Sequence, residues 1–75
     1  HYQVTGQVKN IGDKIVEQIK VVATFYDGKD RIIEVVHTYL ENPLPPGDET
    51  EFEITVVDEP VSKRIETFHI QAVGL

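Results

Sequence analysis

Histidine and serine are the side chains of this sequence that could supply a catalytic base and a nucleophile. The chain has three histidines, His1, His37 and His69, and one serine, Ser62, which lies in a proline-bearing segment. A serine nucleophile needs a base within hydrogen-bond reach, and the Gly-x-Ser-x-Gly turn of many hydrolases does not occur here. His37 and His69 fall in extended segments, where a solvated or packed imidazole is the usual state. We therefore expect no catalytic residues and no enzymatic activity.

Carboxylates are the next candidates, because 13 Asp and Glu stand against 7 Lys and Arg. Calcium needs about six to eight oxygen ligands that converge on one loop. Asp27 and Asp30 enclose a lysine, which disfavours such a site. In the run Asp48–Glu53 the glutamates alternate, so we expect them to line one solvated face and protect a sheet edge. We predict no metal site and no cofactor; calcium held by distant acidic turns remains an alternative.

Aromatic rings are the third possibility, because sugar sites on β-sheet proteins use flat exposed rings. The chain has three tyrosines and no tryptophan. We expect Tyr2 and Tyr39 in the core or at a corner. Tyr26 is opposite in phase to Phe25, which places it near the surface. Glycan binding is therefore the main ligand-binding alternative.

Net charge limits the classes of partner. The formal charge is −6 and there is no cysteine. A nucleic-acid-binding domain needs Lys and Arg to displace counterions from phosphates, and anionic lipid also attracts basic segments. No apolar run approaches the roughly 20 residues that span a bilayer. We expect protein partners, no nucleic acid, no membrane insertion by this domain, and no disulfide.

Apolar and polar residues alternate with a period of two, which is typical of half-buried strands. The pattern predicts extended segments over residues 2–9, 15–26, 31–40, 51–56 and 67–74. Residues 31–40 have two competing apolar faces: Ile33, Val35, His37 and Tyr39 against Ile32, Val36 and Leu40. A β-bulge would let both sets contribute to the core.

Glycine, proline and short polar residues mark the turns between these segments. Asp27–Asp30 predicts a hairpin in which Asp27 caps the turn and Gly28 takes a positive φ. Glu41–Asp48 contains three of the prolines and predicts a crossing between two sheets, with Gly47 at a tight turn. Asp58–Lys63 predicts a second proline-bearing loop.

Two residues in or just after the first extended segment have expected structural roles. Asn10 lies where the strand becomes a turn, so its amide is expected to bond nearby backbone groups. Gly6, inside a strand, indicates close approach of another backbone or a bulge.

Five or six strands with short links and no convincing helix predict a small antiparallel immunoglobulin-like β-sandwich. Residues 1–75 form one domain on this interpretation. The sequence begins His1-Tyr2 without methionine, so we expect it to be part of a longer protein.

Four spaced motifs carry a family resemblance: Val4–Asn10, Val22–Gly28, Leu44–Gly47 and Phe52–Ile54. In this order they resemble the FxLYD family of immunoglobulin-like domains, and also the cell-adhesion-related (CARDB) domains of bacteria and archaea. The five-residue signature falls on Ala23–Asp27, where Tyr26-Asp27 matches and Ala23 and Phe25 depart from it. The resemblance implies a non-catalytic module of an extracellular or membrane-anchored protein, outside the cytoplasm.

We therefore expect a spacer, adhesion or protein-contact domain, with a carbohydrate- or calcium-binding accessory module of an enzyme as the alternative. Candidate contact loops are Asn10–Lys14, Asp27–Asp30 and Glu41–Asp48. If Val22, Tyr26 and one face of residues 31–40 are contiguous, they would form an apolar patch that docks a neighbouring domain. Val57 is also expected to point outward.

Overall fold

The computed structural model describes residues 1–75 and is an all-β protein with one short helix. Its elements are β1 (Tyr2–Lys9), β2 (Ile19–Tyr26), β3 (Ile32–Leu40), β4 (Glu49–Val56), α1 (Glu59–Ser62) and β5 (Thr67–Gly74). The predicted strands are confirmed, with shifts of a few residues at their ends.

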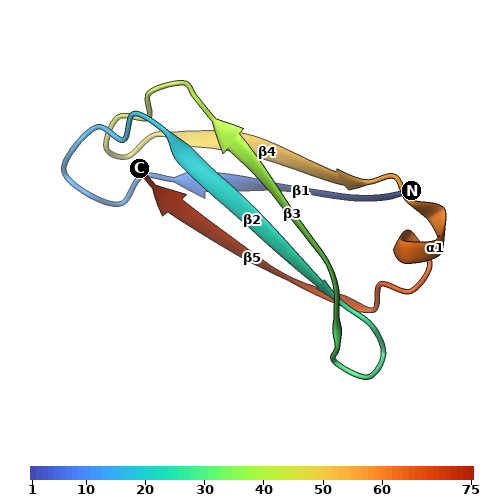
Figure 1. Ribbon diagram of the computed structural model, residues 1–75. Coiled ribbons are helices and arrows are strands. Elements are labelled where there is room, and N and C mark those ends of the chain that lie inside the picture. Colours follow the sequence, from blue (N-terminus) through green and yellow to red (C-terminus); the bar gives the residue numbers. More distant parts are fainter.

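The strands form two antiparallel sheets that lie in two layers (Figure 1). One sheet pairs β1 with β4, and the other has the order β3-β2-β5. Only β2 and β3 are joined by a hairpin; every other connection passes between the sheets, as predicted for Glu41–Asp48. The molecule is elongated, measuring 40 × 20 × 16 Å.

The core lies between the two sheets and is dominated by β2. Alternate residues of this strand are buried because its neighbours β3 and β5 cover both edges and the other sheet covers one face. The nine buried apolar residues are Val4, Ile19, Val21, Ala23, Phe25, Leu44, Phe52, Ile54 and Val56. Each sheet thus contributes one apolar face, as the period of two predicts.

The expected β-bulge is present in β3. Its register with β2 shifts between Phe25 and Tyr26, which pair with Glu34 and Ile32 and leave Ile33 as the additional residue. Ile33 therefore packs against the core together with Val36 and Leu40, one from the first predicted face and two from the second. The bulge thus lets residues from both candidate faces reach the core, which resolves the ambiguity left by the sequence.

Two segment boundaries differ from the predictions. The extended segment expected from Ile15 begins as a strand only at Ile19. Val16 instead exchanges two backbone hydrogen bonds with Leu44, at 3.0 and 2.8 Å, which holds this part of the chain to the Glu41–Asp48 segment. Residues 59–62, expected as loop, form α1, where Pro60 occupies a first-turn position that needs no intrahelical amide hydrogen.

The β2–β3 turn uses a different positive-φ residue from the one expected. Asp30 has φ 60°, and Gly28 is not among the positive-φ residues. The Asp30 amide donates to the Asp27 carbonyl, and the Asp27 amide donates to the Arg31 carbonyl. This is a three-residue hairpin loop, in which the last residue takes the left-handed conformation that Asp tolerates. Gly47 does have a positive φ, 83°, as expected for its turn.

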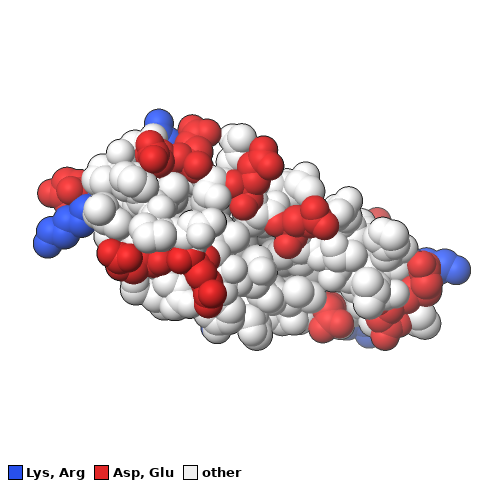
Figure 2. Space-filling model, turned by 90° about the horizontal axis from the view of Figure 1, so that it is seen from above, with Lys and Arg blue, Asp and Glu red and all other residues white.

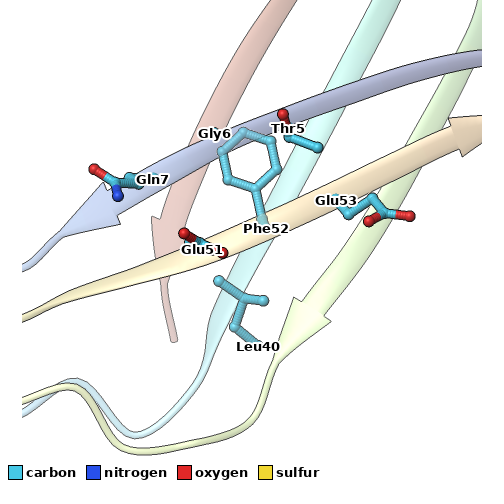
Figure 3. Close-up of a pocket in the computed structure, with 7 residues that line it drawn as sticks. All are labelled: Thr5, Gly6, Gln7, Leu40, Glu51, Phe52 and Glu53. Carbon is cyan, nitrogen blue, oxygen red and sulfur yellow. The ribbon is translucent and has the colours of Figure 1, made fainter.

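Gly6 is required by a close approach of the Phe52 ring, a side chain, whereas another backbone or a bulge was expected there. Gly6 and Phe52 are register partners on β1 and β4, and the ring lies over the glycine (Figure 3). A Cβ at position 6 would lie 2.8 Å from two ring carbons of Phe52, closer than carbon atoms can pack.

We expect Gly6→Ala to lower the free energy of unfolding by about 1–3 kcal/mol, because the core aromatic ring must move. Phe52→Leu in the same chain should recover part of this loss. The double variant should therefore lose less unfolding free energy than the two single variants lose in sum. Gly28→Ala is the matched control, since its added Cβ meets Glu66 at 3.5 Å, an ordinary contact. Urea denaturation checks this; equal effects of the two alanine substitutions would contradict it.

Candidate functional site

Two of the three candidate contact loops meet at one end of the molecule, around the side chain of Asn10. Its Nδ2 donates to the Lys14 carbonyl at 2.7 Å and to the Leu44 carbonyl at 2.9 Å, while its Oδ1 accepts from the Gly12 amide at 2.9 Å. Asn10 is buried, and all three side-chain hydrogen bonds are to backbone groups. The expectation that its amide bonds nearby backbone is confirmed.

The backbone of Asn10 joins the same two loops a second time. Its amide donates to the Asp48 carbonyl at 3.0 Å, and its carbonyl accepts from the Gly47 amide at 2.8 Å. The Asn10–Lys14 and Glu41–Asp48 loops are therefore held as one unit, although some 30 residues separate them in sequence. A shallow depression of about 320 Å³ lies beside this unit and includes Ile11, Val16 and Leu44 in its lining.

The third candidate loop, Asp27–Asp30, lies at the opposite end of β2 (Figure 1). Asp27 is only 6% exposed. Its Oδ1 accepts from the Lys29 amide at 2.8 Å and from the Arg31 amide at 3.0 Å. Its Oδ2 accepts from Arg31 Nε at 2.9 Å, and a nitrogen of the Arg64 guanidinium lies 3.8 Å away. The expected cap of the turn is confirmed.

These contacts set the ionisation of Asp27. The backbone amides of Arg31 and Lys29 bond its carboxylate and lower its pKa below the ordinary value; burial opposes this, and the Arg31 guanidinium adds to the lowering. Both oxygens are already satisfied by these donors, so the arrangement stabilises a hairpin and leaves no oxygen directed at a ligand.

The carboxylates of β4 lie where the alternation places them. Glu49, Glu51 and Glu53 are exposed and pair in register with Lys9, Gln7 and Thr5 of β1. A depression of about 510 Å³ lies here; in Figure 3 the Glu51 and Glu53 carboxylates lie on opposite sides of the Phe52 ring. Nowhere do three His, Asp or Glu side chains come close enough to hold a metal ion.

The histidines lie on the solvent side of the three-stranded sheet. His37 of β3 pairs with Val22, and His69 of β5 pairs with Thr24, so β2 separates the two side chains. Both are exposed, and the His37 ring meets the Tyr39 ring edge-on at 5.6 Å. His1 is exposed at the chain start, whereas Ser62 is buried, with its hydroxyl donating to the Glu59 carbonyl at 3.2 Å.

The tyrosines are distributed differently from the expectation. Tyr2 packs against the core, with its ring 5.8 Å from that of Phe25, as expected. Tyr39, expected in the core or at a corner, is 45% exposed, because Val36 and Leu40 of β3 face the core and alternation turns Tyr39 to the opposite side. Tyr26, expected near the surface, is half-buried. Tyr39 is therefore the most exposed of the three rings.

The solvent side of the three-stranded sheet forms a continuous surface with little charge, here called the outer face. Its members are Lys20, Val22, Thr24, Tyr26, Ile32, Val35, His37, Tyr39, Thr67, His69, Gln71 and Val73. Lys20 is the one Lys, Arg, Asp or Glu among them, and its Nζ lies 6.0 Å from the centre of the Tyr39 ring. Val35, Tyr39 and Val73 are exposed. Val22 and Tyr26 are thus contiguous with one face of β3, as the expected patch requires, since they pair with His37 and exposed Ile32. Exposed Val57 lies outside it.

Comparison with protein-family models, curated proteins and solved structures finds no match for this chain. The one helix, α1, is four residues long, and no helix is long and apolar enough to cross a membrane.

Sequence reasoning did not identify two features of these sites. Arg64 reaches Asp27 from the far side of α1, and Leu44 supplies a carbonyl to Asn10; neither carries a local signal, because both contacts depend on long-range packing. The exposure of Tyr39 depended on which of the two candidate faces of residues 31–40 turns inward, and the sequence left that open.

Asp27 predicts a specific pH dependence. A carboxylate with a lowered folded-state pKa stabilises the protein above its unfolded pKa, about 3.9, and this stabilisation is lost as pH falls through the lower folded value. We expect Asp27→Asn to lower the urea midpoint most at neutral pH, and the difference from the parent protein to shrink below about pH 4. Exposed Asp13→Asn serves as control and should follow the parent curve. A difference for Asp27→Asn that stays constant with pH would contradict this account.

Proposed function

We propose that this chain is an immunoglobulin-like β-sandwich module and not an enzyme. It makes protein contacts, as a spacer or adhesion domain, within a larger extracellular or membrane-anchored protein. Two antiparallel sheets in two layers, short end loops and an elongated shape support this proposal. The motif resemblance to FxLYD and CARDB domains supports it from the sequence side and is the basis for a location outside the cytoplasm.

The observation that carries the proposal is the outer face. A chain in which 27% of residues are charged would ordinarily cover an exposed sheet face with charge, yet this face has Lys20 alone. Exposed Val35, Tyr39 and Val73 surround half-buried Val22. Interface centres are depleted of charge and enriched in aromatic residues, and the outer face has this composition.

The polar groups that chemistry would need support the same conclusion. Asn10 and Asp27 are buried and fully engaged with backbone and guanidinium donors or acceptors. These two side chains hold the loops and the hairpin in place, which fits a structural module.

Glycan binding by the outer face is the second candidate. It is favoured by Tyr39, whose exposed ring has His37 at its edge and the Lys20 ammonium at 6.0 Å from its centre. A ring of this kind can stack on a sugar while neighbouring polar groups bond its hydroxyls.

Selection of a phage-displayed library of random linear peptides on the immobilised domain tests the protein-contact proposal. We expect enriched peptides whose affinity falls at least about tenfold, or 1.4 kcal/mol, for Val22→Lys, which places a charge at the centre of the outer face. Thr5→Lys, the same charge change on the outer side of the two-stranded sheet, is the control and should retain binding. Peptides that bind both variants equally, or no enrichment, would contradict the proposal.

A glycan array and a calcium titration, followed by backbone amide NMR shifts, separate the alternatives. We expect flat responses in both. A glycan signal lost in Tyr39→Ala would instead establish the second candidate, and calcium-dependent shifts at Asp48–Glu53 would establish a metal-binding module.

A further inference from the structure

The edges of the two sheets are protected unequally. A strand at a sheet edge exposes unpaired amides and carbonyls, and proteins usually guard such edges with charges, prolines or bulges. β4 carries Glu49, Glu51 and Glu53 along its length, and β3 carries a bulge and Glu34. Figure 2, viewed from the top of Figure 1, where β4 lies, shows acidic side chains along this side.

β5 has none of these protections. It lies at the edge of the three-stranded sheet, pairs only with β2, and has the sequence TFHIQAVG, without Lys, Arg, Asp, Glu or Pro. Phe68 is 42% exposed although it shares the inner face with buried Phe25, because no strand lies beyond β5. Val73 and Leu75 are exposed as well. The free edge of β5 is therefore apolar and open to another strand.

We propose that β5 pairs antiparallel with β5 of a second copy, about a two-fold axis at Gln71, to form a continuous six-stranded sheet. This inference goes beyond the proposed function and does not rest on it, because it uses the free backbone edge of β5, although the Gln71 side chain also belongs to the outer face. Self-pairing of this kind is an isologous interface, in which each residue meets its own symmetry-related counterpart.

Side-chain size selects this register. Alternate side chains of a strand lie on opposite faces, and directly opposite residues of paired strands point to the same side. A two-fold axis normal to the sheet therefore pairs one residue with its own copy. With the axis at Gln71, Phe68 lies opposite Gly74 and Ile70 opposite Ala72 on the inner face. Each large side chain meets a small one, and an aromatic ring across from an edge glycine is a favourable cross-strand pair.

The neighbouring registers fit less well. An axis at Ile70 places two Ile70 side chains opposite each other and draws Glu66 into the paired segment. An axis at Ala72 places two Ala72 side chains opposite each other and Ile70 opposite Gly74, so Phe68 faces no small residue of β5. The register at Gln71 pairs the whole segment from Thr67 to Leu75 and contains no Lys, Arg, Asp or Glu.

Charge also favours a second copy at this edge over the β4 edge. Each copy carries a formal charge of −6, so association through β4 would bring its glutamates together. The β5 edge lets two acidic molecules meet without facing carboxylates. Added salt should therefore strengthen association, since it screens the net repulsion and there is no ion pair in the interface to weaken.

Sedimentation equilibrium over a concentration series tests the proposal. We expect the apparent mass to rise from 8.5 kDa to twice that value, and to do so at lower concentration in high salt. Gln71→Lys places two ammonium groups opposite each other and should weaken association at least about tenfold. Gln7→Lys, on the solvent side of β1, is the matched control and should dimerise like the parent. A chain that stays monomeric up to millimolar concentration, or equal dimerisation of both variants, would overturn the proposal.

Cysteine cross-linking tests the register independently of stability, because the chain has no cysteine of its own. Gln71→Cys should form an intermolecular disulfide readily under mild oxidation, since paired Cα atoms lie about 4.5–5.5 Å apart. His69→Cys should not, because its counterpart would be roughly 13 Å away along the strand. Equal cross-linking at both positions would contradict the two-fold axis at Gln71, and efficient cross-linking at His69 alone would place the axis elsewhere.

Discussion

The hydrogen bonds of Asn10 are the constraint on which the arrangement of this domain depends. Because β1 pairs with β4 and β2 with both β3 and β5, the chain passes between the layers after β1, β3 and β4. Asn10 fixes two of these crossings together. Its side-chain amide donates to carbonyls of both loops, and its backbone bonds Gly47 and Asp48 of the second loop. A buried amide with every group satisfied is stabilising, whereas one lost partner would leave buried backbone groups unpaired.

Buried polar side chains hold the loops at both ends of the domain, and the sheet surfaces lie between these ends. Asn10 holds one end and Asp27 the other, where it closes the β2–β3 hairpin and approaches Arg64 beyond α1. The remaining surface is divided by charge: the β4 side is acidic, while the outer face and the β5 edge are almost free of charge. This division gives the acidic protein two places where another polypeptide can approach without repulsion.

The strands and turns were predictable because they depend on local alternation and on turn residues, as the β2–β3 hairpin illustrates. The pairing of β1 with β4 and of β2 with β5 was not, because strands far apart in sequence carry no local signal for their partners. Local rules also failed where two residues compete for one role, since Asp30 rather than Gly28 takes the left-handed position. At the candidate sites, the roles of Asn10 and Asp27 followed from residue type and position. Their long-range partners and the exposure of Tyr39 required the fold.

Amide hydrogen exchange tests the central claim, that Asn10 joins the loops to the core, most directly. The amides of Gly47, bonded to the Asn10 carbonyl, and of Leu44, bonded to Val16, lie in a loop that would ordinarily exchange rapidly. In the parent protein, we predict that both amides are protected to the same extent as the Ala23 amide of the central strand. In Asn10→Ala, we predict that both exchange faster while the Ala23 amide remains protected. Exchange of Gly47 and Leu44 at the rate of an unprotected loop in the parent protein would contradict the account.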